Sequence, residues 1–115
     1  MLWRDDAVVL KGMVNAPEEY SQKITPLKKA KVLYIDDFLK VKKGSVPTSA
    51  DINLAFELIN YRYINKDLIT LISSEWLAEE IVSIDEAVGS RIYERSKNYC
   101  LEFSGAGKNQ RLKLN

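Results

Sequence analysis

Two adjacent aspartates, Asp36 and Asp37, directly follow the short apolar run Val32–Ile35. An apolar run of this length, bounded by polar residues, is typical of a strand that is buried on both faces, as in a parallel sheet. The two aspartates cannot both belong to the core, because an unpaired ionised carboxylate is too costly to bury. In open parallel sheets the carboxyl ends of the strands face the ligand crevice, so the pair would lie where paired carboxylates suit a divalent cation. The alternative is a strand that simply ends in a polar turn.

A second apolar run, Leu68–Ile72, ends in the polar residues Ser73, Ser74 and Glu75. The residues between the two runs predict a long helix, which Thr48 would cap with Asp51 three residues on. Its apolar residues follow at spacings of three and four, which predicts one face packed on a sheet: Ile52, Ala55, Phe56, Ile59 and Tyr63.

A strand, a helix of this length and another strand predict a crossover between parallel strands. The two strands would then end at the same edge of the sheet. We therefore expect four polar side chains to converge there: Asp36, Asp37, Ser74 and Glu75.

Arg91 and Arg95 are four residues apart in a predicted helix that begins at Asp85, so they share one helical face. Strand-end acids, a polar residue on the neighbouring strand and an arginine are parts of sites that hydrolyse nucleotides. There the acid holds Mg²⁺, the polar residue orients the attacking water and the arginine offsets charge in the transition state. An exposed arginine pair is otherwise most often solvated, or paired with an acid such as Glu94.

The segment Ser104–Asn109, SGAGKN, is not a phosphate-binding loop. Such a loop needs GxxxxGK followed by Ser or Thr, between a strand and a helix. Here Glu102 stands at the first glycine position, Asn109 follows the lysine, and no helical pattern comes after it. We predict a turn after a strand.

The composition predicts one small domain over residues 1–115, with 46% hydrophobic and 29% charged residues. A net charge of +1 gives no bulk argument for binding nucleic acid or a membrane. The absence of histidine excludes histidine-based catalytic triads and histidine-ligated zinc. With Cys100 as the single cysteine, no apolar stretch near ~18 residues and no signal peptide at MLWRDD, we expect a cytoplasmic protein without a membrane partner.

Turn and capping residues divide the remainder of the chain. Met1–Arg4 would be the end of a strand, and Asp5 or Asp6 would cap a helix. Pro17 opens a second helix, in which Pro26 predicts a break or a new first turn. Further expected elements are a short helix over Trp76–Ser83, a helix with the unusual interior Gly89, and a third strand over Tyr99–Phe103.

Four segments in this order and spacing resemble the AAA+ ATPases of the DnaC/IstB helicase-loader type, in their phage and prophage branch, from about Trp3 to Arg111. They are VLYIDDFLK (Val32–Lys40), PTSADINLAFELINYRY (Pro47–Tyr63), LITLISSEW (Leu68–Trp76) and DEAVGSRIYER (Asp85–Arg95), and the closing FSGAGKNQR also fits the family's ending. The resemblance implies a truncated P-loop NTPase of the three-layer α/β type, with a parallel sheet and helices on both faces.

The resemblance also implies a role for each strand-end residue. Asp36 would be the Mg²⁺-water ligand of a Walker B strand, and Asp37 would hold the metal with it and polarise the attacking water. Ser74 and Glu75 would lie at the sensor-1 position, where the family more often has Asn. Arg95, ahead of Arg91, would be the arginine finger, and Arg111 would be the sensor-2 arginine that contacts the nucleotide.

A full family member carries a Walker A loop and its strand before the residue that is Met1 here. The family resemblance places that strand in the middle of the sheet, between Leu68–Ile72 and Tyr99–Phe103. Two strands would then expose unpaired backbone edges. We expect either the last strand or a second chain, in a homo-oligomer or with a strand-completing partner, to close this gap.

The resemblance implies a DNA replication protein that binds ATP and Mg²⁺ and delivers a replicative helicase to DNA. Because the Walker A loop is lacking, we expect the chain alone to hydrolyse ATP poorly or not at all. Single-stranded DNA is a further expected partner, through Lys40, Lys42 and Lys43, in which case affinity would fall steeply with salt. Two alternatives stay open: a non-catalytic module that docks on a full-length loader through Arg91 and Arg95 and regulates its assembly, and an inactive remnant.

Overall fold

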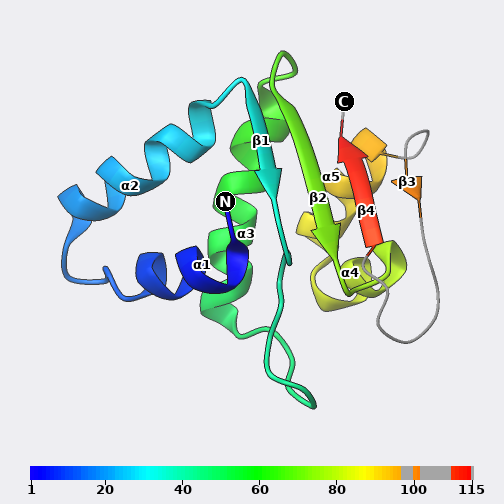
Figure 1. Cartoon of the computed structure of the whole chain (residues 1–115), viewed down its shortest axis with the longest axis horizontal. Coiled ribbons are helices and arrows are strands. Elements are labelled where there is room, and N and C mark those ends of the chain that lie inside the picture. The colour runs from blue at the N-terminus through cyan, green and yellow to red at the C-terminus, as the bar shows by residue number, and fades with distance from the viewer. Residues whose placement is uncertain (97–99, 102–109, 115) are drawn as a thin grey trace.

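The computed structural model describes residues 1–96 and the backbone of residues 100–101 and 110–114 (Figure 1). The predicted turn over Ser104–Asn109 and most of the predicted strand Tyr99–Phe103 lie outside these ranges. Over the described residues the chain is an α/β protein in which helices and strands alternate. None of the helices in this part of the chain combines the length and the apolar character that a membrane crossing requires.

Four strands form one sheet in the order β1-β2-β4-β3. β1 (Val32–Ile35) pairs in parallel with β2 (Ile69–Ser74), and α3 (Ser49–Ile64) connects them, as the sequence predicted. β4 (Gln110–Leu114) runs antiparallel to β2 and pairs on its other side with β3 (Cys100–Leu101). The expectation of an all-parallel sheet is therefore wrong. The position between β2 and the strand at Cys100, where we expected a gap, is occupied by β4, a strand that the sequence patterns did not predict.

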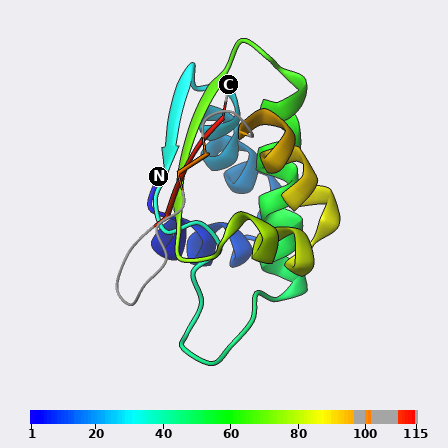
Figure 2. The ribbon, with the colours of Figure 1, turned by 90° about the vertical axis from the view of Figure 1, so that its right-hand side faces the viewer.

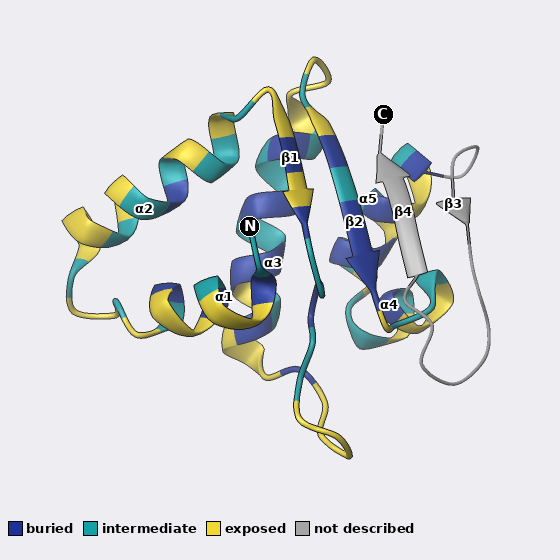
Figure 3. Ribbon diagram, viewed as in Figure 1, coloured by how far each residue is buried: buried dark blue, intermediate teal, exposed yellow. Residues whose placement is uncertain are grey.

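Helices cover only one face of this sheet in the described residues, so the expectation of helices on both faces is wrong. Figure 2 shows the strands edge-on, with all the helices on one side. Side chains of β1 alternate accordingly: Leu33 and Ile35 are buried, whereas Val32 is 56% exposed and Tyr34 41% exposed. β1 is thus a half-buried strand and not one buried on both faces, and Figure 3 shows the same alternation along the ribbon.

The two N-terminal helices differ from the predictions in detail. α1 (Trp3–Lys11) begins at Trp3, two residues before the predicted caps, and Asp6 accepts a hydrogen bond from the backbone N–H of Leu2. Only Leu2 keeps the predicted strand character, through a parallel bridge to Asp36. α2 (Pro17–Lys29) continues through Pro26, which lies inside the helix, so the predicted break does not occur.

The helix between the two parallel strands has the predicted cap. The side chain of Thr48 accepts from the backbone N–H of Asp51, and the Asp51 carboxylate accepts from the backbone N–H of Thr48, which is a complete capping box. The buried face differs from the predicted stripe, of which only Ala55 and Ile59 are buried, whereas Ile52, Phe56 and Tyr63 are partly exposed. The difference arises because α3 also packs against α1, α2 and α5. Its buried residues are Asp51, Leu54, Ala55, Leu58, Ile59 and Arg62.

α4 (Ala78–Ile84) and α5 (Glu86–Ser96) pack closely against each other. Asp85 caps α5 as predicted, since its carboxylate accepts a hydrogen bond from the backbone N–H of Val88 at 3.0 Å. Gly89 has a packing reason: a Cβ at this position would lie 2.4 Å from the Cα of Val82. Only glycine permits this approach of the two helix backbones.

Candidate functional site

The carboxyl ends of β1 and β2 bring polar side chains together, as the sequence predicted. Ile35 pairs with Ile72 in the parallel register, so Asp36 and Ser73 come next on the two strands. The Ser73 hydroxyl donates to Asp36 Oδ1 at 2.6 Å and accepts from the backbone N–H of Asp37 at 3.3 Å. Because Ser73 is buried and its hydroxyl donates a hydrogen bond to a carboxylate, it fixes the position of Asp36.

The turn that follows β1 is strained and firmly held. Asp37 and Leu39 both adopt left-handed backbone angles, with φ of 56° and 60°. This region is uncommon for residues other than glycine, and such strain is a recurrent feature of functional sites. The end of β2 secures the turn: the backbone N–H of Phe38 donates to the Ser73 carbonyl at 2.8 Å, and the indole N–H of Trp76 donates to the Leu39 carbonyl at 2.9 Å.

The two other predicted strand-end residues have contacts of a different kind. Ser74 is buried, its hydroxyl donates to the Phe38 carbonyl at 2.9 Å, and it also accepts from the backbone N–H of Trp76. Glu75 is exposed and pairs with Lys40 at 2.9 Å, and this hydrogen bond raises the pKa of the Lys40 ammonium. Ser74 thus supports the turn, whereas Ser73, which the sequence patterns did not single out, contacts the aspartate. Ile35 pairs with Ile72, so the next residue on β2 that lies beside Asp36 is Ser73.

Asp36 and Asp37 offer carboxylate oxygens, which are ligands of the kind that Mg²⁺ takes. Mg²⁺ keeps several waters and takes one or two carboxylates together with substrate phosphates. Across the part of the chain that the structure describes, no three His, Cys, Asp or Glu residues form a cluster able to hold a metal. Asp36 accepts the hydrogen bond from Ser73, and neither aspartate makes a salt bridge within the same residues.

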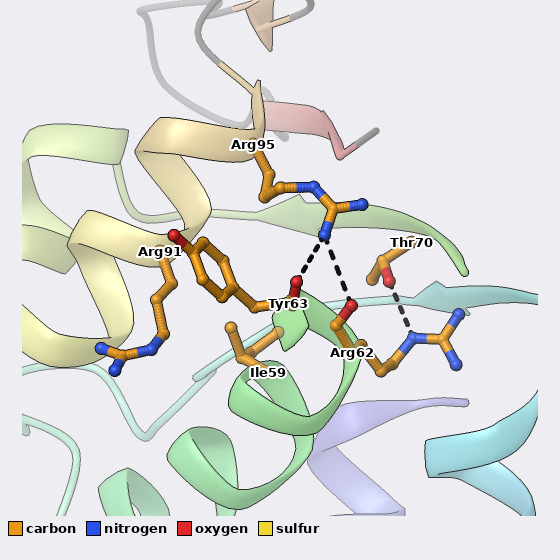
Figure 4. A pocket seen from close by; sticks show the side chains of 6 residues that line it. All are labelled: Ile59, Arg62, Tyr63, Thr70, Arg91 and Arg95. Atoms are coloured by element: carbon orange, nitrogen blue, oxygen red, sulfur yellow. Dashed lines mark hydrogen bonds between the residues drawn. The ribbon is translucent and has the colours of Figure 1, made fainter. Parts of the chain in front are cut away.

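The two predicted arginine fingers lie on α5 beside the end of α3 (Figure 4). Arg95 donates to the carbonyls of Tyr63 at 2.9 Å, Arg62 at 3.4 Å and Leu68 at 3.5 Å. Leu68 directly precedes β2, and Ser74 is the last residue of that strand. At about 3.3 Å per residue the backbones of Leu68 and Ser74 are roughly 20 Å apart, so Arg95 is held at the opposite end of β2 from the aspartates.

Arg91 lies one turn earlier on α5 and is half-buried. Its Nε donates to the Asn60 side chain at 2.9 Å, and its guanidinium lies 5.0 Å from the ring centre of Phe56 and 5.7 Å from that of Tyr63. Cation–π contacts of this kind are modest at partly exposed sites. Arg111, the predicted sensor-2 residue, pairs with Ser73 in the register of β2 and β4, which places its backbone two strands away from Asp36, with β2 between them.

Arg62 is the buried charge that sequence reasoning missed. It is 2% exposed, and burial, with a smaller contribution from the charge of Arg95, lowers the pKa of its guanidinium. Its side chain donates to Thr70 Oγ1 at 2.7 Å and to four carbonyls, those of Leu27, Lys28, Ala30 and Ile69. It therefore caps the end of α2 and joins it to the start of β2, at the opposite end of the sheet from the aspartates.

Comparison with known proteins gives two relatives from Bacillus subtilis (strain 168). The chain is 42% identical over 86 residues to the phage-like element PBSX protein XkdC, which covers 73% of this chain and 32% of XkdC. It is 38% identical over 95 residues to the uncharacterized protein YqaM, which covers 81% of this chain and 28% of YqaM. The chain thus spans about a third of the length of these curated relatives. No family model and no solved structure matches it.

Proposed function

We propose that the chain is the Walker B to sensor-2 part of an AAA+ ATPase of the helicase-loader type, a truncated P-loop NTPase fold. In this proposal it supplies the magnesium half of an ATP site and hydrolyses ATP only when another segment or chain supplies the phosphate-binding loop. The observation that carries the proposal is the contact between Asp36 and Ser73 at the ends of two parallel strands, beside a strained turn. The proposed partners are a replicative helicase or a full-length loader.

In the proposed site Asp36 is the Mg²⁺ ligand and Ser73 is its positioning residue. Asp37 polarises the attacking water, and Glu75 is held by its ion pair with Lys40. The buried contacts of Ser74 favour a supporting role for that residue and not contact with water. The bound magnesium would neutralise phosphate charge and leave the protein the tasks of positioning and electrostatic stabilisation.

Arg91 is the better candidate for an arginine finger that acts on a neighbouring molecule. A finger must leave its contacts within its own chain, and Arg95 would abandon three carbonyl acceptors to do so. Arg91 is held by one amide side chain, one carbonyl and two ring faces at the surface. This reverses the order of preference that the family resemblance alone suggested.

Paramagnetic broadening by Mn²⁺ tests the site directly, since Mn²⁺ takes the same oxygen ligands as Mg²⁺. In isotope-labelled protein, Mn²⁺ with ATP should broaden the backbone amide signals of Asp36, Asp37 and Ser73 before others. The effect should disappear in Asp36→Asn and persist in Asp67→Asn, an exposed acid at the other end of β2. Broadening that is no stronger around Asp36 than around Asp67 would contradict the proposal.

The proposal also requires that the chain alone turn over little or no ATP. A steady ATPase activity of the purified chain that is lost in Asp37→Asn would show that the site is complete without a phosphate-binding loop. Contamination is excluded by the same comparison, because a contaminating ATPase would be indifferent to the substitution.

A further inference from the structure

A groove of about 680 Å³ lies between α1 and the segment 40–48, which leads from the turn after β1 to α3. Figure 1 shows this segment projecting beyond the end of β1 that carries the aspartates, beside α1. The groove is separate from the proposed magnesium site, because neither Asp36 nor Asp37 lines it. It is the largest of the hollows found on the described surface.

The floor of the groove is aliphatic and unusually exposed. Val8 on α1 is 64% exposed, and Val46 on the facing segment is 73% exposed. Ala7 and Val41 also line the groove. Large exposed aliphatic side chains that line one hollow mark a surface for apolar contact.

The rim carries an excess of positive charge. Five of the lining residues are cationic, but Lys11 pairs with Asp51 and Lys40 pairs with Glu75. Lys42 and Lys43 make no ion pair within residues 1–96, and Arg4 has only the exposed neighbour Asp5 at 3.7 Å. Three cations therefore remain to meet negative charge from outside.

Both walls are held in place, so the groove is preformed. Trp3 packs edge-on against Phe38 with ring centres 5.0 Å apart, and the ion pair of Lys11 and Asp51 ties α1 to the start of α3. The facing segment is pinned by buried Pro47 and turns at Gly44, which has φ of 84°. A preformed surface binds without the cost of ordering.

We propose that this groove docks an acidic, aliphatic protein segment. Its apolar side chains would cover Val8 and Val46, and its carboxylates would meet Arg4, Lys42 and Lys43. A nucleic acid single strand is the less suitable occupant, because such strands stack their bases on exposed aromatic rings. The one aromatic residue in the groove lining, Trp3, is 1% exposed.

The test uses a fluorescent helical peptide of about four turns, with leucines at helical spacing on one face and glutamates elsewhere. Fluorescence anisotropy with the whole chain should show saturable binding. A single-stranded oligonucleotide of similar charge, and the same peptide with lysines in place of glutamates, should bind more weakly. Tighter binding of the oligonucleotide, or equal binding of the lysine peptide, would overturn the proposal, as would no binding of the acidic peptide.

Exposed residues supply matched variants that should all fold. Val46→Asp should weaken peptide binding about tenfold, whereas Val14→Asp, at a valine that is 82% exposed outside the groove, should leave it unchanged. Lys42→Glu should weaken binding more than Lys66→Glu does, and added salt should remove that difference. Equal effects of a groove variant and its control would place the binding elsewhere.

Discussion

Replacement of Arg62 by methionine tests whether its buried hydrogen bonds or its buried charge decide the stability of this fold. Methionine keeps most of the aliphatic volume but removes all five hydrogen bonds to Thr70 and the four carbonyls. The carbonyls at the end of α2 and the groups at the start of β2 would lose their partner at the same time. Burial of the guanidinium acts in the opposite direction, because it lowers the pKa of Arg62 and disfavours the charged form.

The two effects can be weighed. Leaving a buried acceptor unsatisfied costs about 1–3 kcal/mol. The acceptors most directly left without a donor are the Thr70 hydroxyl and the carbonyls of Ile69 and Ala30. Removal of a desolvated cation stabilises the folded state by several kcal/mol at most. Since solvent can reach the carbonyls at the end of α2 in part, we expect a net loss of about 3 kcal/mol. For a domain of this size that lowers Tm by more than about 10 °C.

Urea unfolding followed by circular dichroism measures this loss, with Arg91→Met as the matched control. Arg91 is half-buried and should cost no more than about 1 kcal/mol. An Arg62→Met protein within about 1 kcal/mol of the wild type, or one more stable, would refute the reasoning, because it would show that desolvation of the charge cancels its hydrogen bonds.

Three further substitutions test other parts of the structure. Ser73→Ala should cost about 2 kcal/mol in the free energy of unfolding and remove the Mn²⁺ effect at Asp36 without unfolding the chain. Gly89→Ala should cost about 2 kcal/mol, because its Cβ would meet the Val82 backbone, and Gly12→Ala, measured in the same way, should be tolerated. Burial opposes ionisation of Asp51, but hydrogen bonds from Lys11 and Thr48 outweigh it and lower the pKa of this carboxyl below the ordinary value for an aspartate. The ionised carboxylate therefore adds stability above that value, which is lost as pH falls through the lower folded pKa, so Asp51→Asn should flatten the acid side of a stability–pH curve.

Much of the unit β1–α3–β2 could be predicted because its signals are local. The apolar runs, the capping box of Thr48 and Asp51 and the length of the connecting helix each depend on residues close in sequence. Parallel pairing follows from that length, and convergence of the strand ends follows from parallel pairing. The cap at Asp85 belongs to the same group.

The errors share a different cause, which is that each depended on what another part of the chain does. Whether Ser73 or Ser74 contacts Asp36 depends on which face of the sheet each serine side chain points to. A register shift of one residue would move every side chain of the strand to the opposite face. α2 continues through Pro26 although proline removes a helical hydrogen bond, so local propensity did not decide where this helix ends. Burial of Arg62 depends on the end of α2 and the start of β2, which meet around it.

The sequence by itself thus determined which elements form around the candidate site and at which edge of the sheet the two aspartates lie. Only the tertiary structure decided which side chain holds Asp36, that the helices lie on one face, that β4 runs antiparallel beside β2, and that Arg95 turns toward the end of α3. The physical reason is one of range. Capping and periodicity depend on residues a few positions apart in the sequence. The face of the sheet that the helices cover, the strand order and the partners of a long side chain depend on packing between distant segments.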